Sequence, residues 1–489
     1  MVNMPPQGST AVVGTQGNGA ESEFEMTERP EGIVFPAGVT TDVGGGIGLA
    51  DRDEMAERAL RYPAGNSSAA GAVSNYVNTI VGAGIVGLPF ALAESGLWMG
   101  MFMMCLAAFL NVQSSNMLIA IGEKTGRLNY EELMADVFGN AGIYFVSLFV
   151  GVLAFGAMSA YLVIVGDTVP EILLASGSTT GAFADRTSVI LLFGIFCMLP
   201  VSMLKDMSKL SYTSFVSILA DLLLTLIVLF AGSEEARDDP DIDRSQVNTF
   251  IRPTIFAGFG AISFAFVCQS SSFLVYRSMS KGGVDRWACV SRWSVSIAFV
   301  MGLTLALGGY LNFVNETQGN ILNNFSTEHK AASVARGFLA VTMVFTYPME
   351  MYVVRHVVDV SVFQTFLGMG PISSARHYGI TIVLWGLTII LATSTDNLGS
   401  ILEIFGAFGA SAVGYIMPPL LFMKSNRAQF RRAVAVWRKG APEYDPALGE
   451  RLWAMRKFYL PIFMVVFGVT AMVAGVATAV VSELSPTKA

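Results

Sequence analysis

The chain has 489 residues, of which 53% are hydrophobic and only 14% are charged. Soluble domains carry about a quarter charged residues, and here the apolar residues gather from Val73 onward into long stretches split by short polar loops. This distribution excludes a chain of soluble domains. The net charge of −7 gives no reason to expect a nucleic-acid partner, and no CxxC spacing predicts a zinc site or a disulfide framework among Cys105, Cys197, Cys268 and Cys289.

Residues 1–71 differ from the rest in composition. They are rich in Gly, Pro, Ser, Thr and acidic residues and contain few large apolar side chains. Such a segment cannot bury enough apolar surface to fold. We therefore expect a disordered tail, and a regulatory or gating role for it stays open.

The apolar stretches predict an all-α membrane protein with eleven transmembrane helices in one domain, residues 72–483. A helix needs about 20 apolar residues to cross a bilayer core of about 30 Å. The stretches of that length are 73–95, 97–121, 143–166, 187–204, 209–232, 253–276, 287–314, 331–357, 377–395, 399–423 and 458–482.

The basic residues predict the orientation. Lys and Arg gather in alternate loops and above all in the segment between the tenth and eleventh helices, which runs from Lys424 to Lys457. Cytoplasmic loops carry the excess of Lys and Arg. The N-terminal tail is therefore expected in the cytosol and the C-terminus on the opposite face.

The first helix contains Gly82-Ala-Gly84-Ile-Val-Gly87-Leu-Pro89. The glycines fit the spacing of a dinucleotide-binding fingerprint, but the strand and βαβ unit that this fingerprint needs are missing. Two readings remain: close packing between helices, or an interruption of the helix within the membrane. Free backbone groups are tolerated there only if they are buried in protein or line a cavity, where N–H groups suit a carboxylate and carbonyls suit a cation.

The sixth helix also contains possible interruptions, at Gly258-Phe-Gly260 and at Gln269-Ser-Ser-Ser272. Breaks in helices one and six are expected from two inverted five-helix repeats. The repeats would span residues 72–232 and 253–424, followed by the eleventh helix at 458–482.

Several of these stretches resemble the amino acid/auxin permease family, and within it sodium-coupled neutral amino acid transporters and fungal vacuolar amino acid transporters. The first-helix stretch Asn78 to Gly96 is the most specific. Further likenesses cover Phe264 to Cys268, Thr346-Tyr-Pro348 with Arg355, and the tenth helix from Asp396 to Lys424.

The resemblance implies a leucine-transporter-like fold and secondary active transport of amino acids, with the lipid bilayer as the second partner. Carried over by motif position, the substrate would contact Gly82, Ala83, Gly84, Ile85 and Gly87 in helix one, and Ala265, Phe266 and Cys268 in helix six. The coupling cation of sodium-coupled members would contact Asn78 and Thr346. Many relatives have histidine where this chain has Gln269, so a proton relay through that position is not expected, since glutamine does not titrate.

Ionisable residues inside membrane helices are candidates for function because they cost about 2.5 kcal/mol or more at the bilayer centre. The apolar segments contain Asp221, Glu350 and Glu403. Glu350 follows Thr346 by four residues and therefore shares its helix face, which makes it the first choice for a coupling carboxylate. A structural pairing is the alternative for each.

The sequence thus predicts a transporter that uses alternating access, driven by a proton or sodium gradient without a further cofactor. No nucleophile–base pair or metal cluster predicts an enzyme. The alternatives are a channel and an amino acid sensor that signals through its cytosolic tail. The fungal resemblance favours a vacuolar or lysosome-like membrane over the plasma membrane, while the oligomeric state and the identity of the amino acid are left open.

Overall fold

The computed structural model describes residues 65–175, 177, 185–204, 214–237, 240–280, 282–427 and 448–484. All of them belong to the second of two compact units, Ala56–Ala489. Most of the predicted tail therefore lies outside the described residues. The first described helix begins at Ala69, two residues before the predicted end of the tail at residue 71. It is capped by the Ser68 hydroxyl, which accepts a hydrogen bond from the Gly71 N–H at 3.1 Å.

Within the described residues the fold is helical, and the only β pairing is an isolated bridge between Ser67 and Met279. The predicted first span forms α2 (Ala69–Ile80), η1 (Ala83–Gly87) and α3 (Leu88–Ser95). The spans up to the fifth form α4 (Leu97–Thr125), α6 (Asn140–Ala175), α7 (Arg186–Phe193) with η2 (Gly194–Met198) and α8 (Leu199–Ser202), and α9 (Ser214–Glu235). A short helix that the sequence did not predict, α5 (Tyr130–Phe138), precedes α6.

The second half of the chain is helical as well. It contains α10 (Ile255–Phe266), α11 (Gln269–Ser278), α12 (Val284–Phe313), α13 (Lys330–Val358) extended by η7 (Asp359–Phe366), and α14 (Ser374–Ser394). The tenth predicted span is divided into α15 (Leu398–Phe405), η8 (Gly406–Ala410), η9 (Ala412–Ile416) and α16 (Met417–Ser425), and α18 (Leu448–Leu484) follows. Short helical turns lie in the loops at η4 (Arg244–Gln246), η5 (Val314–Glu316) and η6 (Ile321–Asn324).

Nine helices of the described residues are long and apolar enough to cross a membrane, and the bent pair formed by the first span makes a tenth. The predicted fourth span corresponds to the shorter apolar helix Arg186–Ser202. A multi-pass membrane protein is thus confirmed, while the count of eleven stays a prediction.

The interruption of the first span follows from its sequence. The helix stops at Ile80, Gly82 adopts an extended conformation, and the helical turn η1 leads into α3, where Pro89 occupies the second position. Proline is accepted in the first turn because no intrahelical partner is lost there. The two helical parts are bent by 52°, which confirms the break predicted from the glycines.

In the sixth span the break lies at Val267 and Cys268, between α10 and α11. The predicted interruption at Gly258-Phe-Gly260 is wrong, because α10 runs through it. These two glycines instead allow close packing: a Cβ on Gly258 would meet the Ala91 carbonyl at 2.7 Å, and one on Gly260 would meet the Glu403 carbonyl. The other predicted interruption, at Gln269-Ser-Ser-Ser272, begins one or two residues after the observed break.

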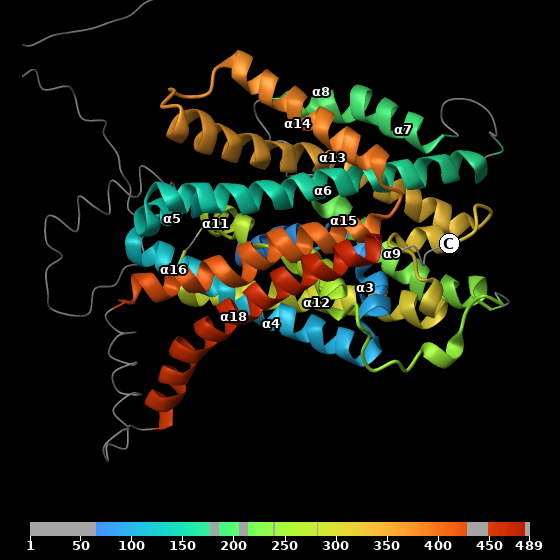
Figure 1. Cartoon of the computed structure of the whole chain (residues 1–489), viewed down its shortest axis with the longest axis horizontal. Coiled ribbons are helices and arrows are strands. Elements are labelled where there is room, and N and C mark those ends of the chain that lie inside the picture. Colours follow the sequence, from blue (N-terminus) through green and yellow to red (C-terminus); the bar gives the residue numbers. More distant parts are fainter. Residues whose placement is uncertain are drawn as a thin grey trace, which may run out of the picture. The chain divides into compact units, whose positions relative to one another are not determined.

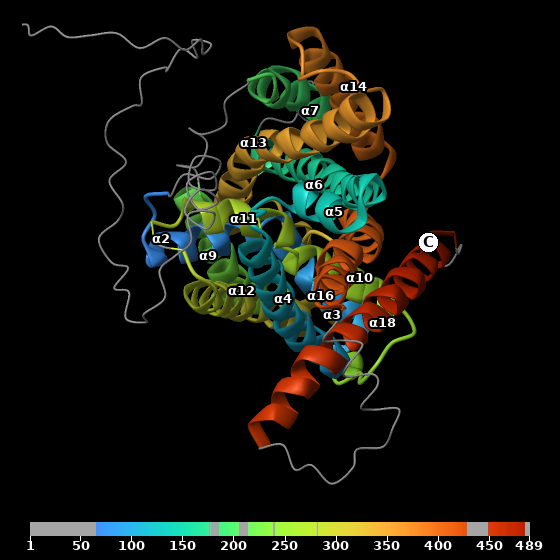
Figure 2. The ribbon, with the colours of Figure 1, turned by 90° about the vertical axis from the view of Figure 1, so that its left-hand side faces the viewer.

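The helices run alongside one another, with α10 in contact with α3, α15, η8 and α18. α6 packs along α13, as both ribbon views show, and α7 and α14 lie on the outer side of that pair (Figures 1 and 2). Figure 2 places α18 on the opposite side of the bundle from α14. α10, the first part of the interrupted sixth span, therefore lies among other helices.

Candidate functional site

The two helix breaks meet each other inside the bundle. Gly84 in η1 lies against Ala265 at the end of α10, so closely that a Cβ on Gly84 would stand 2.5 Å from the Ala265 Cα. The first N–H groups of a helix and its last carbonyls have no partners within the helix. The start of η1 and the end of α10 thus bring donors and acceptors of the backbone into one region.

The other predicted residues of helix one surround this contact. Gly82 is half-buried, and a Cβ on it would lie 3.9 Å from the Tyr161 hydroxyl of α6. Ile85 is buried, Gly87 packs against Leu402 of α15, and Ala83 begins η1. The backbone from residue 82 to 87 is therefore enclosed by α6, α10 and α15.

The predicted residues of helix six point in different directions. Ala265 faces Gly84, whereas the buried Phe266 ring packs toward α12, 6.4 Å from the Phe299 ring. Cys268 is fully buried. Ala265 is thus the residue of this segment that lies against the break in helix one.

The Gln269 side chain fixes the break in helix six, a role that the sequence did not predict. Its Oε1 accepts a hydrogen bond from the Cys268 N–H at 3.1 Å, and its Nε2 donates to Asn111 Oδ1 of α4 at 2.6 Å. Beside it, the Tyr76 hydroxyl bonds to Ser115 at 3.0 Å and Ser272 at 2.7 Å. Buried backbone groups freed by a break need such partners, so this polar cluster holds the interrupted backbone in place.

The predicted ion-coupling residues lie on α2 and α13. The Asn78 Oδ1 is buried and has no hydrogen-bond partner among the described residues. Thr346 donates to the Thr342 carbonyl at 2.7 Å, as in ordinary helix packing, and Glu350 lies one turn further along α13. No hydrogen bond within the described part of the chain joins Asn78 to either of the other two.

Tyr161 of α6 lies beside the break in helix one. Its hydroxyl is 3.9 Å from the position that a Cβ on Gly82 would take, and α6 packs along α13, the helix that contains Glu350. Asp221 is buried, and α9 packs against both α2 and α13. The sequence suggested the two acids separately, whereas Tyr161, one of several polar residues in the long apolar helix α6, gave no signal that would set it apart.

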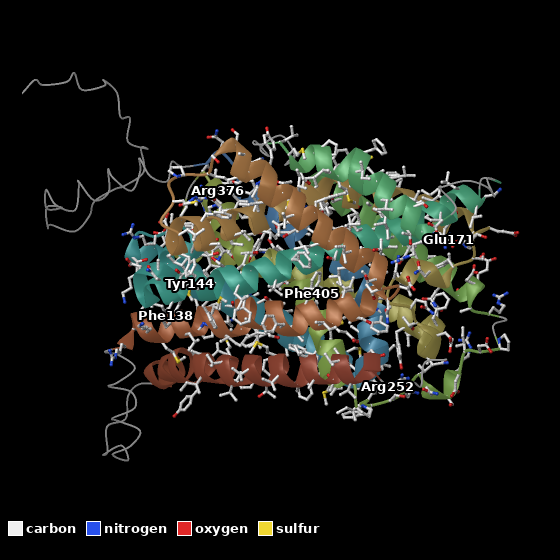
Figure 3. The ribbon with its side chains drawn as sticks, turned by 45° about the horizontal axis from the view of Figure 1, so that its top comes forward. Phe138, Tyr144, Glu171, Arg252, Arg376 and Phe405 are labelled. Carbon is white, nitrogen blue, oxygen red and sulfur yellow. The ribbon has the colours of Figure 1, made fainter. Side chains whose placement is uncertain are left out.

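The loop between α12 and α13 covers the helix-one break on one side. Gly319 of this loop approaches Gly87, since a Cβ there would lie 3.5 Å from the Gly319 carbonyl. Arg336 of α13 holds the loop: its Nη2 donates to the carbonyls of Leu322 at 2.9 Å and Phe325 at 2.6 Å. In Figure 3 this end of the bundle is marked by Glu171 and Arg252, and the opposite end by Phe138 and Arg376.

An ion-pair network ties the same end together. Arg186 at the start of α7 contacts Asp167 of α6 at 2.8 Å and Asp396, which precedes α15, at 3.1 Å. Asp167 also accepts a hydrogen bond from Asn323 of the covering loop at 3.3 Å. These contacts join α6, α7, the loop before α15 and the covering loop at one end of the bundle.

Comparisons with known proteins agree with this architecture. The sequence model of the family described as "Transmembrane amino acid transporter protein" matches residues 65–442. A Danio rerio protein named "Putative sodium-coupled neutral amino acid transporter 11" is 28% identical over 410 residues, covering 83% of this chain and 87% of its own length. The Saccharomyces cerevisiae protein named "Vacuolar amino acid transporter 2" is 28% identical over 416 residues, covering 81% and 86%.

Among solved structures, the inward-facing conformation of Mhp1 is similar, with a TM-score of 0.51 over 87% of this chain and 93% of that chain at 13% identity. This likeness supports a fold of the leucine-transporter type. The relatives are named as transporters and not as enzymes. The chain belongs to the family of transmembrane amino acid transporter proteins, the amino acid/auxin permeases.

Proposed function

We propose that this protein is a secondary active transporter that moves amino acids across a membrane by alternating access. The contact between the two helix breaks, at Gly84 and Ala265, is the observation that carries this proposal. It brings backbone groups that helices leave unpaired into the interior of a membrane bundle. Such irregular backbone in a membrane protein is typical of substrate and ion sites.

The substrate would bind through the parts that all amino acids share. Its carboxylate would accept hydrogen bonds from the N–H groups at the start of η1, around Ala83 and Gly84, where the helix end also favours a negative charge. Its ammonium group would donate to carbonyls at the end of α10. Gly82, Ile85, Gly87 and Cys268 would shape the same backbone segments, while the Phe266 ring would support them from behind.

Two couplings are supported by different contacts. A sodium ion suits Asn78, whose buried Oδ1 has no partner among the described residues, with Thr346 as the predicted second ligand. A proton suits Glu350, whose helix α13 packs against α9, the helix that contains the buried Asp221. We propose these as the alternatives for the driving ion.

Uptake of a labelled amino acid mixture into proteoliposomes, with sodium and pH gradients imposed separately, tests both the transport of amino acids and the identity of the driving ion. Uptake that follows sodium should be lost in Asn78→Ala and kept in the exposed control Asn248→Ala. Uptake that follows the pH gradient should lose its pH dependence in Glu350→Gln but not in the exposed control Glu328→Gln. Absence of uptake under either gradient and of exchange in preloaded vesicles, with folded protein, would refute transport.

We further propose a vacuolar or lysosome-like membrane with the N-terminus in the cytosol. The distribution of Lys and Arg and the vacuolar relative in yeast support this. An epitope tag before Met1 should then be reached by antibody on intact isolated vacuoles, whose cytosolic face is outward. A tag reached only after the vacuoles are permeabilised would reverse the orientation.

A further inference from the structure

A cavity of about 250 Å³ lies where α13 and η7 meet the start of α14, and no residue of the two helix breaks lines it. It lies at the end of the bundle that Arg376 marks in Figure 3. Polar side chains from α13 and from the beginning of α14 line it, among them Tyr352, Arg355, His356, Ser373, Ser374 and His377. Neither the transport site nor the ion-coupling residues include any of these groups.

Arg355 is the cation of this cavity, and its hydrogen bonding is incomplete. The side chain is only 3% exposed. Its Nη1 donates to the Ser202 carbonyl at 2.8 Å and to Thr381 Oγ1 at 2.9 Å, but its Nη2 is buried without a hydrogen-bond partner among the described residues. A buried donor without an acceptor is costly, and more so when it is charged. An anion in the cavity would satisfy it.

The carboxylate that lines the cavity does not neutralise Arg355. The spacing of Arg355 and Asp359 predicts an ordinary i,i+4 ion pair on one helix face, and the structure shows a different pairing. Asp359 contacts the Arg376 Nε at 2.7 Å and accepts a hydrogen bond from Gln364 at 2.6 Å. Because Asp359 forms its ion pair with Arg376, it does not neutralise the positive charge of Arg355.

The start of α14 adds further donors. The Ser373 hydroxyl caps this 21-residue helix by accepting a hydrogen bond from the Arg376 N–H at 3.2 Å. Helix N-termini bind phosphate and carboxylate groups through their first N–H groups and the positive end of the helix dipole. His377 is held beside it by a contact of 3.2 Å between Nε2 and the Met203 carbonyl. Guanidinium, hydroxyl and imidazole groups beside a helix start suit the oxygens of a phosphate group.

The surface beside the cavity indicates where such a phosphate comes from. The turn between η7 and α14 exposes apolar side chains, namely Phe366 (74% exposed), Leu367, Met369 and Ile372. In a protein that spans a membrane, exposed apolar groups beside basic groups at a helix end are typical of the headgroup layer. We propose that this cavity binds a phosphate group, supplied by the headgroup of an anionic phospholipid.

The test uses the full-length protein in nanodiscs of phosphatidylcholine, with and without a phosphatidylinositol phosphate, and native mass spectrometry to count retained lipid. A parallel arm adds soluble inositol phosphate to protein in phosphatidylcholine alone. Wild-type protein should retain the anionic lipid. Arg355→Gln should weaken retention about tenfold, the size of one charged hydrogen bond.

Because Arg355 is buried, its substitution could also impair folding, and His356→Glu provides a second variant. His356 is an exposed lining residue, and a carboxylate there should repel the phosphate by a similar factor while the fold is unchanged. The control Arg292→Gln removes an exposed arginine of α12 that does not line the cavity, and this variant should retain lipid like the wild type. Retention unchanged in both test variants would overturn the site, and binding of soluble inositol phosphate without retention of the lipid would overturn the headgroup as its source.

Discussion

Replacing Gly84 with alanine tests whether the contact between the two helix breaks is needed for transport. The added Cβ would stand 2.5 Å from the Ala265 Cα, 2.9 Å from its Cβ and 3.0 Å from its N. Carbon atoms pack best at about 3.5–4.0 Å, so the two backbones must separate by about 1 Å. Two of these three atoms belong to backbone, which cannot rotate away as the end of a flexible side chain could.

Overpacking of this kind costs about 1–3 kcal/mol, which lowers the population of the close-packed arrangement by a factor of roughly 5 to 150. Gly84→Ala should therefore lower both the melting temperature in detergent and the rate of amino acid uptake into proteoliposomes. If the substrate binds between the breaks, the loss of uptake should exceed what the amount of folded protein explains.

Two controls separate packing from the general effect of adding a methyl group. Gly82→Ala meets its nearest neighbour, the Tyr161 hydroxyl, only at 3.9 Å, so the protein should fold as before. Gly386 of α14 has nothing within 4 Å, and alanine there should stabilise the helix by about 1 kcal/mol. Wild-type stability and uptake in Gly84→Ala would refute the close contact and with it the proposed site.

Further predictions concern the polar contacts. Gln269→Leu leaves the Asn111 side chain and the backbone at the break without their partners, so we expect a loss of about 1–3 kcal/mol of stability, measured as a lower melting temperature; unchanged melting would contradict the role of this amide. Asp167→Asn removes the charge that faces Arg186 at 2.8 Å, with Asp167 only 6% exposed, and should cost about 1–3 kcal/mol. Asp396→Asn removes the other partner of the same arginine, but Asp396 is 93% exposed, so its effect on melting should be near zero; equal effects of the two variants would contradict this ranking.

The break in the first helix could be predicted because its cause is local. Gly82, Gly84 and Gly87 weaken the helix over a few residues, and Pro89 starts a new one. The same argument failed for Gly258 and Gly260, which are part of a regular helix. A glycine in an apolar helix can permit a break or permit close packing, and the neighbouring helix decides between the two.

The break in the sixth helix depends on residues far away in the sequence. Gln269 stabilises the freed backbone only because Asn111, on another helix, accepts its amide hydrogen at 2.6 Å. The pairing of Asp359 with Arg376 instead of Arg355 has the same origin, since Arg376 comes from the following helix. Spacing along one helix ranks the partners on that helix, but it contains no information on partners that other helices supply.

The sequence by itself therefore determined that the chain is a multi-pass helical membrane protein, where its first helix is interrupted, and which family it resembles. These properties depend on composition, segment length and local backbone preference, which a single chain expresses residue by residue. The tertiary structure alone decided that the two breaks touch at Gly84 and Ala265, that Tyr161 lies beside Gly82, and that Arg355 lines a cavity. Such contacts arise when helices distant in sequence pack side by side, so only the assembled bundle specifies them.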